Sequence, residues 1–367
     1  MTDWHSCALG DAVELAYGKS LPKDGRIQTG SVPVYGSNGI TGWHDVAIVN
    51  QPTVIVGRKG SAGAVQYVDQ PCYPIDTTYF VRARAGFQFD SKFLFYLLKR
   101  LDLSRLKTAT GVPGLTREDA YRESIRFPPI EEQRRIVDLL SRAENIVRLR
   151  REAQQKAVEL APAIFLEMFG DPAINPKHWP LATIESICAV KTGATPLRER
   201  KEFYENGTVP WVKTGEVKNG EIFDAEERIT ELAVSSTNCK VFPVNTILVA
   251  MYGQGQTRGR CGILKVPAST NQACVAILPS QHIRHVFLFE LIRLQYERLR
   301  AMGRGGNQAN LNMGMIKAFE VPIPPEYLQL EFERRIQFVS SILRQQFAAT
   351  VASQAVFNSL LGSQFAK

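Results

Sequence analysis

Glycines and a lysine occur together in GRKGSAG at 57–63, a composition that some phosphate-binding loops share. A Walker-type loop places its lysine after the last glycine and opens a helix, whereas Lys59 precedes the second glycine and no helical pattern follows. Strand-forming residues flank the segment on both sides, so a β-hairpin is the better interpretation. The chain also has no glycine-rich strand-to-helix turn suited to an adenosyl cofactor.

Two further residue pairs could carry chemistry. His282 and His285 are spaced i, i+3 on a predicted helix, but no HExxH context surrounds them, so surface or core histidines are expected. Glu216 and Lys218 form a single ExK motif, and a metal-dependent nuclease needs a further acid in a defined place. We interpret this motif as a turn that leads into a strand, and we expect no catalytic site in this chain.

The cysteines show no CxxC pair and no ligand pairs at the spacing of a zinc site. We therefore predict reduced, mostly buried thiols and no metal site. The six residues are Cys7, Cys72, Cys188, Cys239, Cys261 and Cys274.

Signals for binding are stronger than signals for catalysis. Residues 232–289 contain no Asp or Glu but do contain Lys240, Arg258, Arg260, Lys265 and Arg284, which would attract phosphates. Glutamines in the segment GQGQTRGR can form paired hydrogen bonds with base edges, with adenine in particular. A single basic loop is usually a solvated surface, but four such loops occur here, two in each half of the chain.

These loops and their surroundings supply the expected DNA-binding residues. In the first half they are Arg58, Lys59, Ser61, Lys107, Thr108, Thr110 and Arg117. In the second half they are Lys213, Thr214, Tyr252, Gln254, Gln256, Thr257, Arg258, Arg260, Arg304, Asn307, Gln308 and Asn310.

The segments that must position these loops form an internal sequence repeat. Leu115 precedes Pro128-Pro129 by thirteen residues and Leu311 precedes Pro324-Pro325 by the same distance, an offset of 196. The middles differ strongly between the halves. Repeated flanking segments around dissimilar central segments predict two units that have the same kind of function but act on two different targets.

The repeat extends on both sides of these features. Upstream, Trp4, Leu9 and Gly18 correspond to Trp179, Ile184 and Gly193 at an offset of 175, and Val32-Pro33 corresponds to Val209-Pro210 at 177. Downstream, Arg134-Arg135-Ile136 matches Arg334-Arg335-Ile336 at an offset of 200. This last match predicts four extra residues in the second copy, about one helical turn.

After each double proline the pattern predicts a long helix, over 131–167 and 326–367. Residues at alternating steps of three and four are typical of the a/d seam of a coiled coil. The first seam is Ile136, Leu139, Ala143, Ile146 and Arg150, continuing through Ala153, Ala157, Leu160 and Ile164. The second is Ile336, Val339, Leu343, Gln346, Thr350, Ser353, Phe357 and Leu360. The two helices can pack on each other through these seams, or each can pack on its own globular unit.

Composition agrees with a folded protein that binds a polyanion. The chain has 367 residues, 44% of them hydrophobic, with 44 basic against 36 acidic residues and a net charge of +8. No apolar run approaches the ~18–20 residues of a membrane helix, and the first residues do not resemble a signal peptide. We expect a cytoplasmic location. The globular units, with β-hairpins at 53–68 and 246–266 and apolar helices at 93–103 and 285–302, are predicted to be mixed α/β.

At this point the chain resembles the specificity (S) subunits of type I restriction-modification systems over essentially its full length. The resemblance rests on the helix entries IRFPPIEEQRRIVDLL and FEVPIPPEYLQLEFERRI and on EMFGDPAINPKHWP at 167–180. The openings CALGDAVELAYGKSLP and LATIESICAVKTGATP add to it. The second helix entry departs from the shorter form of the motif.

The resemblance implies an α+β fold, in which two similar target recognition domains with twisted β-sheets are separated by two long helices packed as an antiparallel coiled coil. The domains would cover 1–130 and 168–325, and the helices 131–167 and 326–367. Each domain would read one half of a split double-stranded DNA sequence. The helices would set the gap and dock two methyltransferase (M) subunits, which bring S-adenosylmethionine, while restriction (R) subunits bring ATP- and Mg²⁺-dependent chemistry.

Two other classes of function stay open on the sequence. One is a nuclease or methyltransferase that acts alone, which would show activity without partners. The other is an interaction subunit of another defence complex that binds DNA loosely, with equal affinity for all duplexes.

Overall fold

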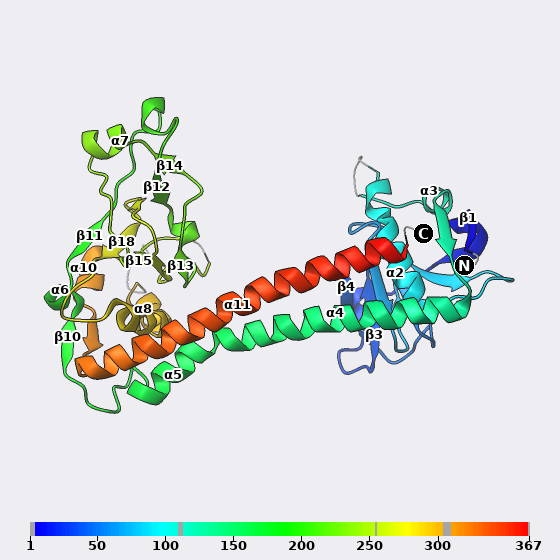
Figure 1. Cartoon of the computed structure of the whole chain (residues 1–367), viewed down its shortest axis with the longest axis horizontal. Coiled ribbons are helices and arrows are strands. Elements are labelled where there is room, and N and C mark those ends of the chain that lie inside the picture. The colour runs from blue at the N-terminus through cyan, green and yellow to red at the C-terminus, as the bar shows by residue number, and fades with distance from the viewer. Residues whose placement is uncertain (1–3, 109–112, 254, 304–309, 366–367) are drawn as a thin grey trace. The chain divides into compact units, whose positions relative to one another are not determined.

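The chain forms two compact units in the computed structural model, which describes residues 4–108, 113–253, 255–303 and 310–365. Unit 1 consists of Met1–Glu152 together with Ala348–Lys367, and unit 2 consists of Ala153–Phe347. Each unit combines a mixed α/β globular part with segments of the long helices labelled α4 and α11 in Figure 1. Both units therefore draw residues from each of the two predicted long helices.

Unit 1 contains two main sheets. The larger has the order β2 (Val13–Tyr17), β8 (Thr78–Ala83), β5 (Thr53–Gly57) and β6 (Val65–Val68). The smaller has the order β4 (Gly39–His44), β3 (Val32–Gly36) and β7 (Tyr73–Pro74), and β1 (His5–Ala8) pairs with β9 (Ser124–Phe127). The helices are α1 (Leu9–Ala12), α2 (Ser91–Leu101) and α3 (Arg117–Tyr121), with 3₁₀ turns at Lys23–Gly25 and Leu103–Leu106.

Unit 2 repeats this plan. Its larger sheet has the order β11 (Val190–Thr192), β18 (Cys274–Ile277), β15 (Ile247–Ala250), β16 (Cys261–Leu264) and β13 (Glu221–Ile222). The smaller has the order β14 (Arg228–Ile229), β12 (Val209–Val212) and β17 (Ser269–Thr270), and β10 (Leu181–Thr183) pairs with β19 (Glu320–Pro322). The helices are α6 (Ile184–Ile187), α7 (Glu231–Ser236), α8 (His285–Leu294), α9 (Tyr296–Met302) and α10 (Met313–Lys317), with 3₁₀ turns at Lys201–Phe203 and Thr214–Glu216.

Matching glycines show that the repeat is structural. A Cβ atom on Gly18 would lie 2.1 Å from the carbonyl oxygen of Ile75, and one on Gly193 would lie 1.8 Å from that of Thr270. In both units the glycine therefore admits a neighbouring backbone where no side chain fits. The two glycines, and the helices α1 and α6 that begin at Leu9 and Ile184, confirm the predicted offset of 175. β3 pairs in parallel with β7, as β12 does with β17, which confirms the predicted offset of 177 for the strands that begin at Val32 and Val209.

The offset of 196 persists into the long helices, which corrects the predicted four-residue insertion. α3 and α10 begin 196 residues apart, and their N-caps, Thr116 and Asn312, each accept a hydrogen bond from the backbone three residues on. Gln133 and Gln329, also 196 apart, are both buried in the first turn after the double proline. The offset of 200 that matches Arg134-Arg135-Ile136 to Arg334-Arg335-Ile336 therefore does not align structurally equivalent residues.

The predicted helix over 131–167 is two helices, α4 (Ile130–Val158) and α5 (Leu160–Phe169). Pro162 has no N–H to donate to the carbonyl of Val158, so the regular helix ends there and a new one begins. The C-terminal helix α11 spans Glu326–Gln364 and contains no proline.

Positions 136, 143, 150 and 157 of the first seam lie inward as predicted, whereas the alternate positions were predicted one residue too early. Leu140 and Val147 are buried, whereas Leu139 is half-buried and Ile146 is 50% exposed. The inward positions of α4 and its continuation are 133, 136, 140, 143, 147, 150, 154 and 157, whereas the second seam lies inward as predicted from Ile336 to Leu360. These sets are related by the offset of 196, so the wrong register followed from the offset of 200.

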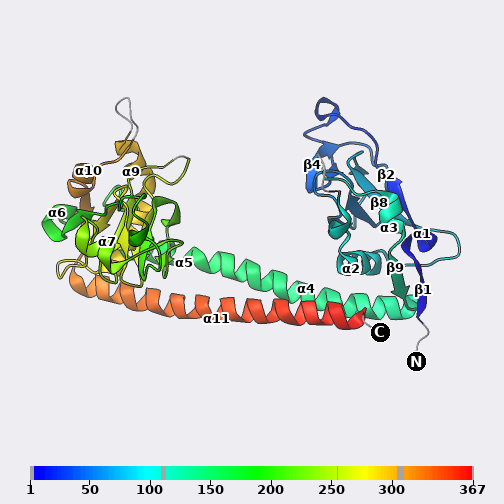
Figure 2. The same ribbon diagram turned by 90° about the horizontal axis from the view of Figure 1, so that it is seen from above.

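Within each unit the two long helices pack both on each other and on the globular part. In unit 1, Ile136, Leu140 and Val147 of α4 share a core with Phe357 and Leu361 of α11 and with the apolar face of α2. The helices run antiparallel there, and Arg151 donates to Gln354 over 2.8 Å. The helical segments carried by unit 1 are seen from another direction in Figure 2.

In unit 2 the same arrangement is built from aromatic rings. Phe165 and Phe169 of α5 surround Phe287 of α8 at centroid distances of 5.2 and 4.8 Å. Phe332 of α11 completes the cluster, 5.5 Å from Phe165. Rings at these distances add stabilisation beyond the burial of their area.

Two smaller expectations are corrected. His282 lies before α8, which begins at His285, so the two histidines do not share a helix. The apolar helix expected over 285–302 is divided at Gln295 into α8 and α9. Among the described helices, none has the length and apolar character needed to cross a membrane.

The corrected register predicts unequal costs for neighbouring apolar residues of α4. We expect Leu140→Ala to lower the free energy of unfolding by about 2–5 kcal/mol, because it leaves a cavity in the core of unit 1. Ile146→Ala should cost no more than about 0.5 kcal/mol, because that side chain is half exposed. Urea denaturation of the two variants measures this, and equal costs would restore the original register.

Candidate nucleic-acid interface

In unit 1 the structure brings two of the predicted basic loops into direct contact. The tip of the β5–β6 hairpin carries Arg58 and Lys59, and the backbone of Leu115 donates to the carbonyl of Arg58 over 2.9 Å. Gly60 in turn donates to the carbonyl of Pro113 over 2.9 Å. The two loops, far apart in the sequence, therefore form one continuous surface.

The second of these loops is closed at its base. The backbone of Thr108 donates to the carbonyl of Gly114 over 3.0 Å, and the N–H of Gly114 donates to the Thr108 hydroxyl over 3.2 Å. Lys107 and Ser61 are exposed beside this closure. Thr110 lies outside the described residues.

An exposed tyrosine joins these cations. The guanidinium carbons of Arg58 and Arg117 lie 5.0 and 4.3 Å from the ring centroid of Tyr17, which is 47% exposed. Cation–π contacts of this kind hold arginine side chains in place at little cost to their charge. We call Tyr17, Arg58 and Arg117 the tyrosine clamp. It gathers two half-buried guanidinium groups around one partly exposed aromatic ring.

In unit 2 the β15–β16 hairpin meets the corresponding loop. The backbone of Leu311 donates to the carbonyl of Met251 over 3.1 Å, which repeats the bond between Leu115 and Arg58. The tip between the strands is longer than in unit 1 and contains Gly253, Gly255 and Gly259 at positive φ, where glycine is favoured. The shared bond fixes the base of each hairpin, while the tips differ in length and side chains.

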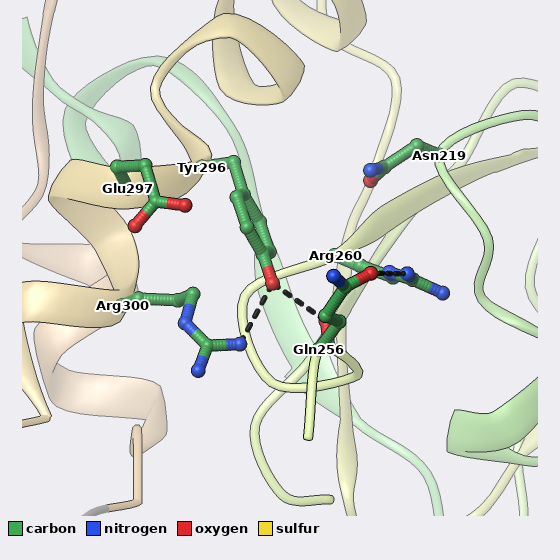
Figure 3. A pocket seen from close by; sticks show the side chains of 6 residues that line it. All are labelled: Asn219, Gln256, Arg260, Tyr296, Glu297 and Arg300. Atoms are coloured by element: carbon green, nitrogen blue, oxygen red, sulfur yellow. Dashed lines mark hydrogen bonds between the residues drawn. The ribbon is translucent and has the colours of Figure 1, made fainter. Parts of the chain in front are cut away.

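The longer tip of unit 2 is held by α9 (Figure 3). The hydroxyl of Tyr296 donates to the carbonyl of Gln256 over 2.7 Å, and Arg300 donates to the carbonyl of Gly255 over 2.8 Å and to the Tyr296 hydroxyl over 2.7 Å. A hollow of about 400 Å³ lies beside these contacts, lined also by Asn219, Arg260 and Glu297.

Within this hollow Gln256 and Arg260 form a pair. Arg260 donates to Oε1 of Gln256 over 2.7 Å, and both side chains come from the hairpin tip. Because a guanidinium only donates, the Gln256 amide is oriented with its oxygen toward Arg260 and its Nε2 donors directed elsewhere. The pair therefore offers mainly donors, which suits acceptor atoms such as phosphate oxygens or the O6 and N7 atoms of guanine.

Most of the other predicted DNA-binding residues of the tip are less exposed to solvent. Tyr252 is 40% exposed, whereas Thr257, Arg258 and Asn310 are half-buried. The Nε atom of Arg258 is shielded from solvent and has no acceptor among the residues described. Gln254, Arg304, Asn307 and Gln308 lie outside the described residues.

Several predicted cations are committed to acidic partners. Lys213 donates to Glu227 over 2.8 Å, a bond that raises the pKa of Lys213, and it lies 3.5 Å from Glu226. Its neighbour Thr214 begins the 3₁₀ turn that follows β12. Lys213 thus belongs to a cluster on the smaller sheet, with its charge offset by two carboxylates.

Lys265 and Arg284, counted above among the phosphate-attracting residues, are also paired. Lys265 lies 3.0 Å from Glu221, and Arg284 lies 2.6 Å from Glu333 on α11. The stretch over 232–289 is acid-free in sequence only, because other segments supply the acids. Lys240 is exposed.

Sequence reasoning missed Tyr17, Tyr296 and Arg300. Tyr17 ends a strand, and its role depends on arginines 41 and 100 residues away. Tyr296 and Arg300 are spaced i, i+4 on a helix interpreted as core, and their shared polar face was the available signal.

The thiols behave as predicted. All six cysteines are free, and five of them are buried. Burial raises the pKa of Cys261, directly after the hairpin tip, to about 12, so its thiol stays protonated near neutral pH. Among the described residues, no group of three or more His, Cys, Asp or Glu could hold a metal ion.

Comparison with known proteins adds a family to this geometry. The model of the type I restriction modification DNA specificity domain matches residues 1–160 and again residues 176–337. A stretch of 135 residues is 29% identical to the EcoR124I/EcoR124II specificity subunit of Escherichia coli, covering 36% of this chain and 33% of that relative. A stretch of 271 residues is 23% identical to the MjaIX specificity subunit of Methanocaldococcus jannaschii, covering 67% and 62%. The chain thus matches less than two thirds of the length of either relative.

Solved structures share the fold. The chain is similar to the crystal structure of a type I restriction-modification S subunit from M. genitalium, with a TM-score of 0.63, 17% identity and coverage of 99% of this chain and 96% of the other. It is also similar to a chain from a study of complex assembly and conformational transition in the type I system, with a TM-score of 0.64, 18% identity and coverage of 100% and 98%.

The bonds from α9 predict that the hairpin tip of unit 2 depends on one hydroxyl. We expect Tyr296→Phe to speed amide hydrogen exchange at 255–260 about fivefold, because a hydrogen bond contributes roughly 1 kcal/mol. Tyr204→Phe is the matched control, since that hydroxyl also donates to a backbone carbonyl, of Pro196, in another part of unit 2. Equal effects of both variants at 255–260 would contradict the assignment.

Proposed function

Because the chain belongs to the type I restriction-modification DNA specificity family, we propose that it is the subunit that selects the DNA sequence for such a system. In this proposal unit 1 reads one half of a bipartite double-stranded target and unit 2 reads the other. The observation that carries it is the repetition of one frame with different hairpin tips. Base contacts define a sequence and phosphate contacts fix position, so a constant frame with variable tips suits two different half-sites.

The described side chains support DNA as the ligand. The tyrosine clamp offers two guanidinium groups to phosphates or base edges, and Lys59 adds a third cation on the same hairpin. In unit 2, Gln256 and Arg260 are oriented as donors, and Arg300 secures the backbone that carries them. Neutralising phosphates with such cations releases counterions and makes affinity depend on salt.

The long helices supply the spacing in this proposal. α11 has 39 residues, which corresponds to about 58 Å at 1.5 Å per residue. One turn of B-DNA measures ~34 Å, so such a helix is long enough to separate two half-sites that lie on successive turns. Its length would define the gap that the protein tolerates.

The helices also offer surfaces for partners. Ile146 and Leu149 of α4 are 50% and 55% exposed, and Val351 and Val356 of α11 are 55% and 56% exposed, although the buried seams lie elsewhere on the same helices. A contiguous exposed apolar patch marks a protein interface, and Ile146 and Leu149, three residues apart, lie on one face of α4. We propose that they dock the methyltransferase subunits.

Catalysis and cofactors belong to the partners in this proposal. Two methyltransferase subunits would bring S-adenosylmethionine and methylate adenine, and restriction subunits would bring ATP- and Mg²⁺-dependent cleavage. This chain would act without a catalytic residue of its own, as the part of the complex that selects the target.

Substitutions in one unit should change one half-site only. In the complete methyltransferase complex, Gln256→Ala should relax base preference at one position of the half read by unit 2, with a change of about 1–3 kcal/mol for that base. Arg117→Ala, which opens the tyrosine clamp, should affect only the other half. Binding selection from a randomised duplex library measures both.

The same library provides a control for charge alone. Lys59→Ala should weaken binding to all sequences alike and reduce the salt slope by about 1, the behaviour of a phosphate contact. If Gln256→Ala changed the base preference in both half-sites, the modular assignment would be contradicted. It would also be contradicted if the unsubstituted complex bound every duplex with the same affinity.

The docking surface predicts a defect in assembly without a defect in folding. We expect Leu149→Glu to weaken association with the methyltransferase about tenfold or more, because docking would bury the leucine side chain. Gln155→Glu, on a different face of the same helix and also exposed, should leave association unchanged. Analytical ultracentrifugation with thermal unfolding separates the effects; equal association of both variants would refute this surface.

A further inference from the structure

A buried glutamine stands at the start of each long helix. Gln133, which is 1% exposed, donates through Nε2 to the carbonyl of Pro128 over 2.9 Å and to that of Gln88 over 3.2 Å. Its Oε1 atom accepts from the backbone N–H of Asp90 over 3.0 Å. Asp90 is the N-cap of α2, so one side chain connects the entry of α4 with the entry of α2.

Unit 2 contains the same connection. Gln329, which is 2% exposed, donates through Nε2 to the carbonyl of Pro324 over 2.8 Å, and its Oε1 accepts from the backbone N–H of Arg284 over 2.9 Å. Arg284 is the N-cap of α8. We call each set, Gln133 with Pro128 and Asp90, and Gln329 with Pro324 and Arg284, a glutamine bridge.

The local backbone explains why glutamine is required. In both helices the N–H of the glutamine itself bonds to the carbonyl of the second proline, which leaves the carbonyl of the first proline to the side chain. The N–H of each N-cap residue precedes its helix and likewise needs an acceptor. Only an amide side chain of this length provides a donor and an acceptor together, and a buried group left unpaired is costly.

Further contacts brace each bridge. In unit 1 the hydroxyl of Tyr96 on α2 donates to Glu144 of α4 over 2.9 Å. In unit 2, Arg284 also bonds to Glu333 of α11 over 2.8 Å, and the carboxylate of Glu333 is nearly buried. Each globular part therefore meets its long helix through directional bonds as well as through apolar packing, which resists rotation about the contact.

We infer that Gln133 and Gln329 are positioning residues for the spacing of the two half-sites, an inference that rests on the proposed function. Each glutamine bridge fixes the direction in which a long helix leaves its reading unit. Without that fixed direction the helix would keep its length, but it would no longer hold the two half-site contacts at one separation. The glutamines thus determine which gap between half-sites the protein prefers, and they do not determine the contacts within a half-site.

The test compares duplexes that differ only in the gap. The complete complex carries Gln133→Met and Gln329→Met, which preserve side-chain volume and remove every bond of the two bridges. Affinity is measured for a bipartite duplex with the native gap, for duplexes one base pair longer and shorter, and for a duplex with a single half-site. We expect preference for the native gap to fall about fivefold or more, while single half-site affinity changes less than about twofold.

Two further variants keep the result interpretable. Gln155→Met is the control for a glutamine-to-methionine change on an exposed position of α4 and should preserve the gap preference. Gln133→Met alone removes one bridge and leaves the other intact, so it should give an intermediate preference even if the double variant folds poorly.

The outcomes separate the two proposals. An unchanged gap preference in the folded bridge variants overturns the inference and leaves the proposed function intact. An equal loss of affinity for all four duplexes also overturns it, because the glutamines would then serve stability alone. If the unsubstituted complex binds the duplexes with different gaps equally well, the proposed function fails and this inference fails with it.

Discussion

Each unit of this protein is completed by a helix from the other half of the sequence, and the rest of the structure depends on that exchange. Unit 1 buries Phe357 and Leu361 from the end of the chain against α2 and α4. Unit 2 buries Phe165 and Phe169, encoded with the first repeat, against α8 and α11. Fully burying such side chains contributes about 1.5–3 kcal/mol each, so neither globular part is complete without the helix pair.

This exchange explains why the two copies can differ so much at their tips. The helix entries, the N-caps Thr116 and Asn312 and the glutamines 133 and 329 keep one offset because they meet a shared packing arrangement. The hairpin tips are held by different partners in the two units, Pro113 in unit 1 and Tyr296 and Arg300 in unit 2. A constant base with a variable tip allows a new sequence preference in one unit without rebuilding the joint between unit and helix.

Much of this architecture could be predicted from the sequence, and the exceptions have physical causes. Double prolines, glycine-rich hairpins and the second seam follow from local rules. The first seam does not, because Leu139 and Leu140, like Ile146 and Val147, are adjacent apolar pairs that fit either register. A buried polar residue, Gln133, decides between them, and hydrophobic spacing carries no information about it.

The candidate site was predictable in its loops but not in its partners. Arg58 and Arg117 were recognisable as cations, whereas their meeting on Tyr17 depends on three distant segments. Lys213 and Lys265 looked equally available, but Glu227 and Glu221 arrive from elsewhere in the chain to pair with them. Ion pairing between segments is a tertiary property, which charge counting along one segment cannot detect.

The central claim is that two reading units of one fold select two half-sites at a defined separation. Long-read sequencing of DNA methylated by this chain with its methyltransferase tests it most directly, because the modified adenines reveal the whole target. The account predicts one motif with two specified halves and an unspecified gap of constant length. A single continuous motif, or halves found at many different gaps, would contradict it.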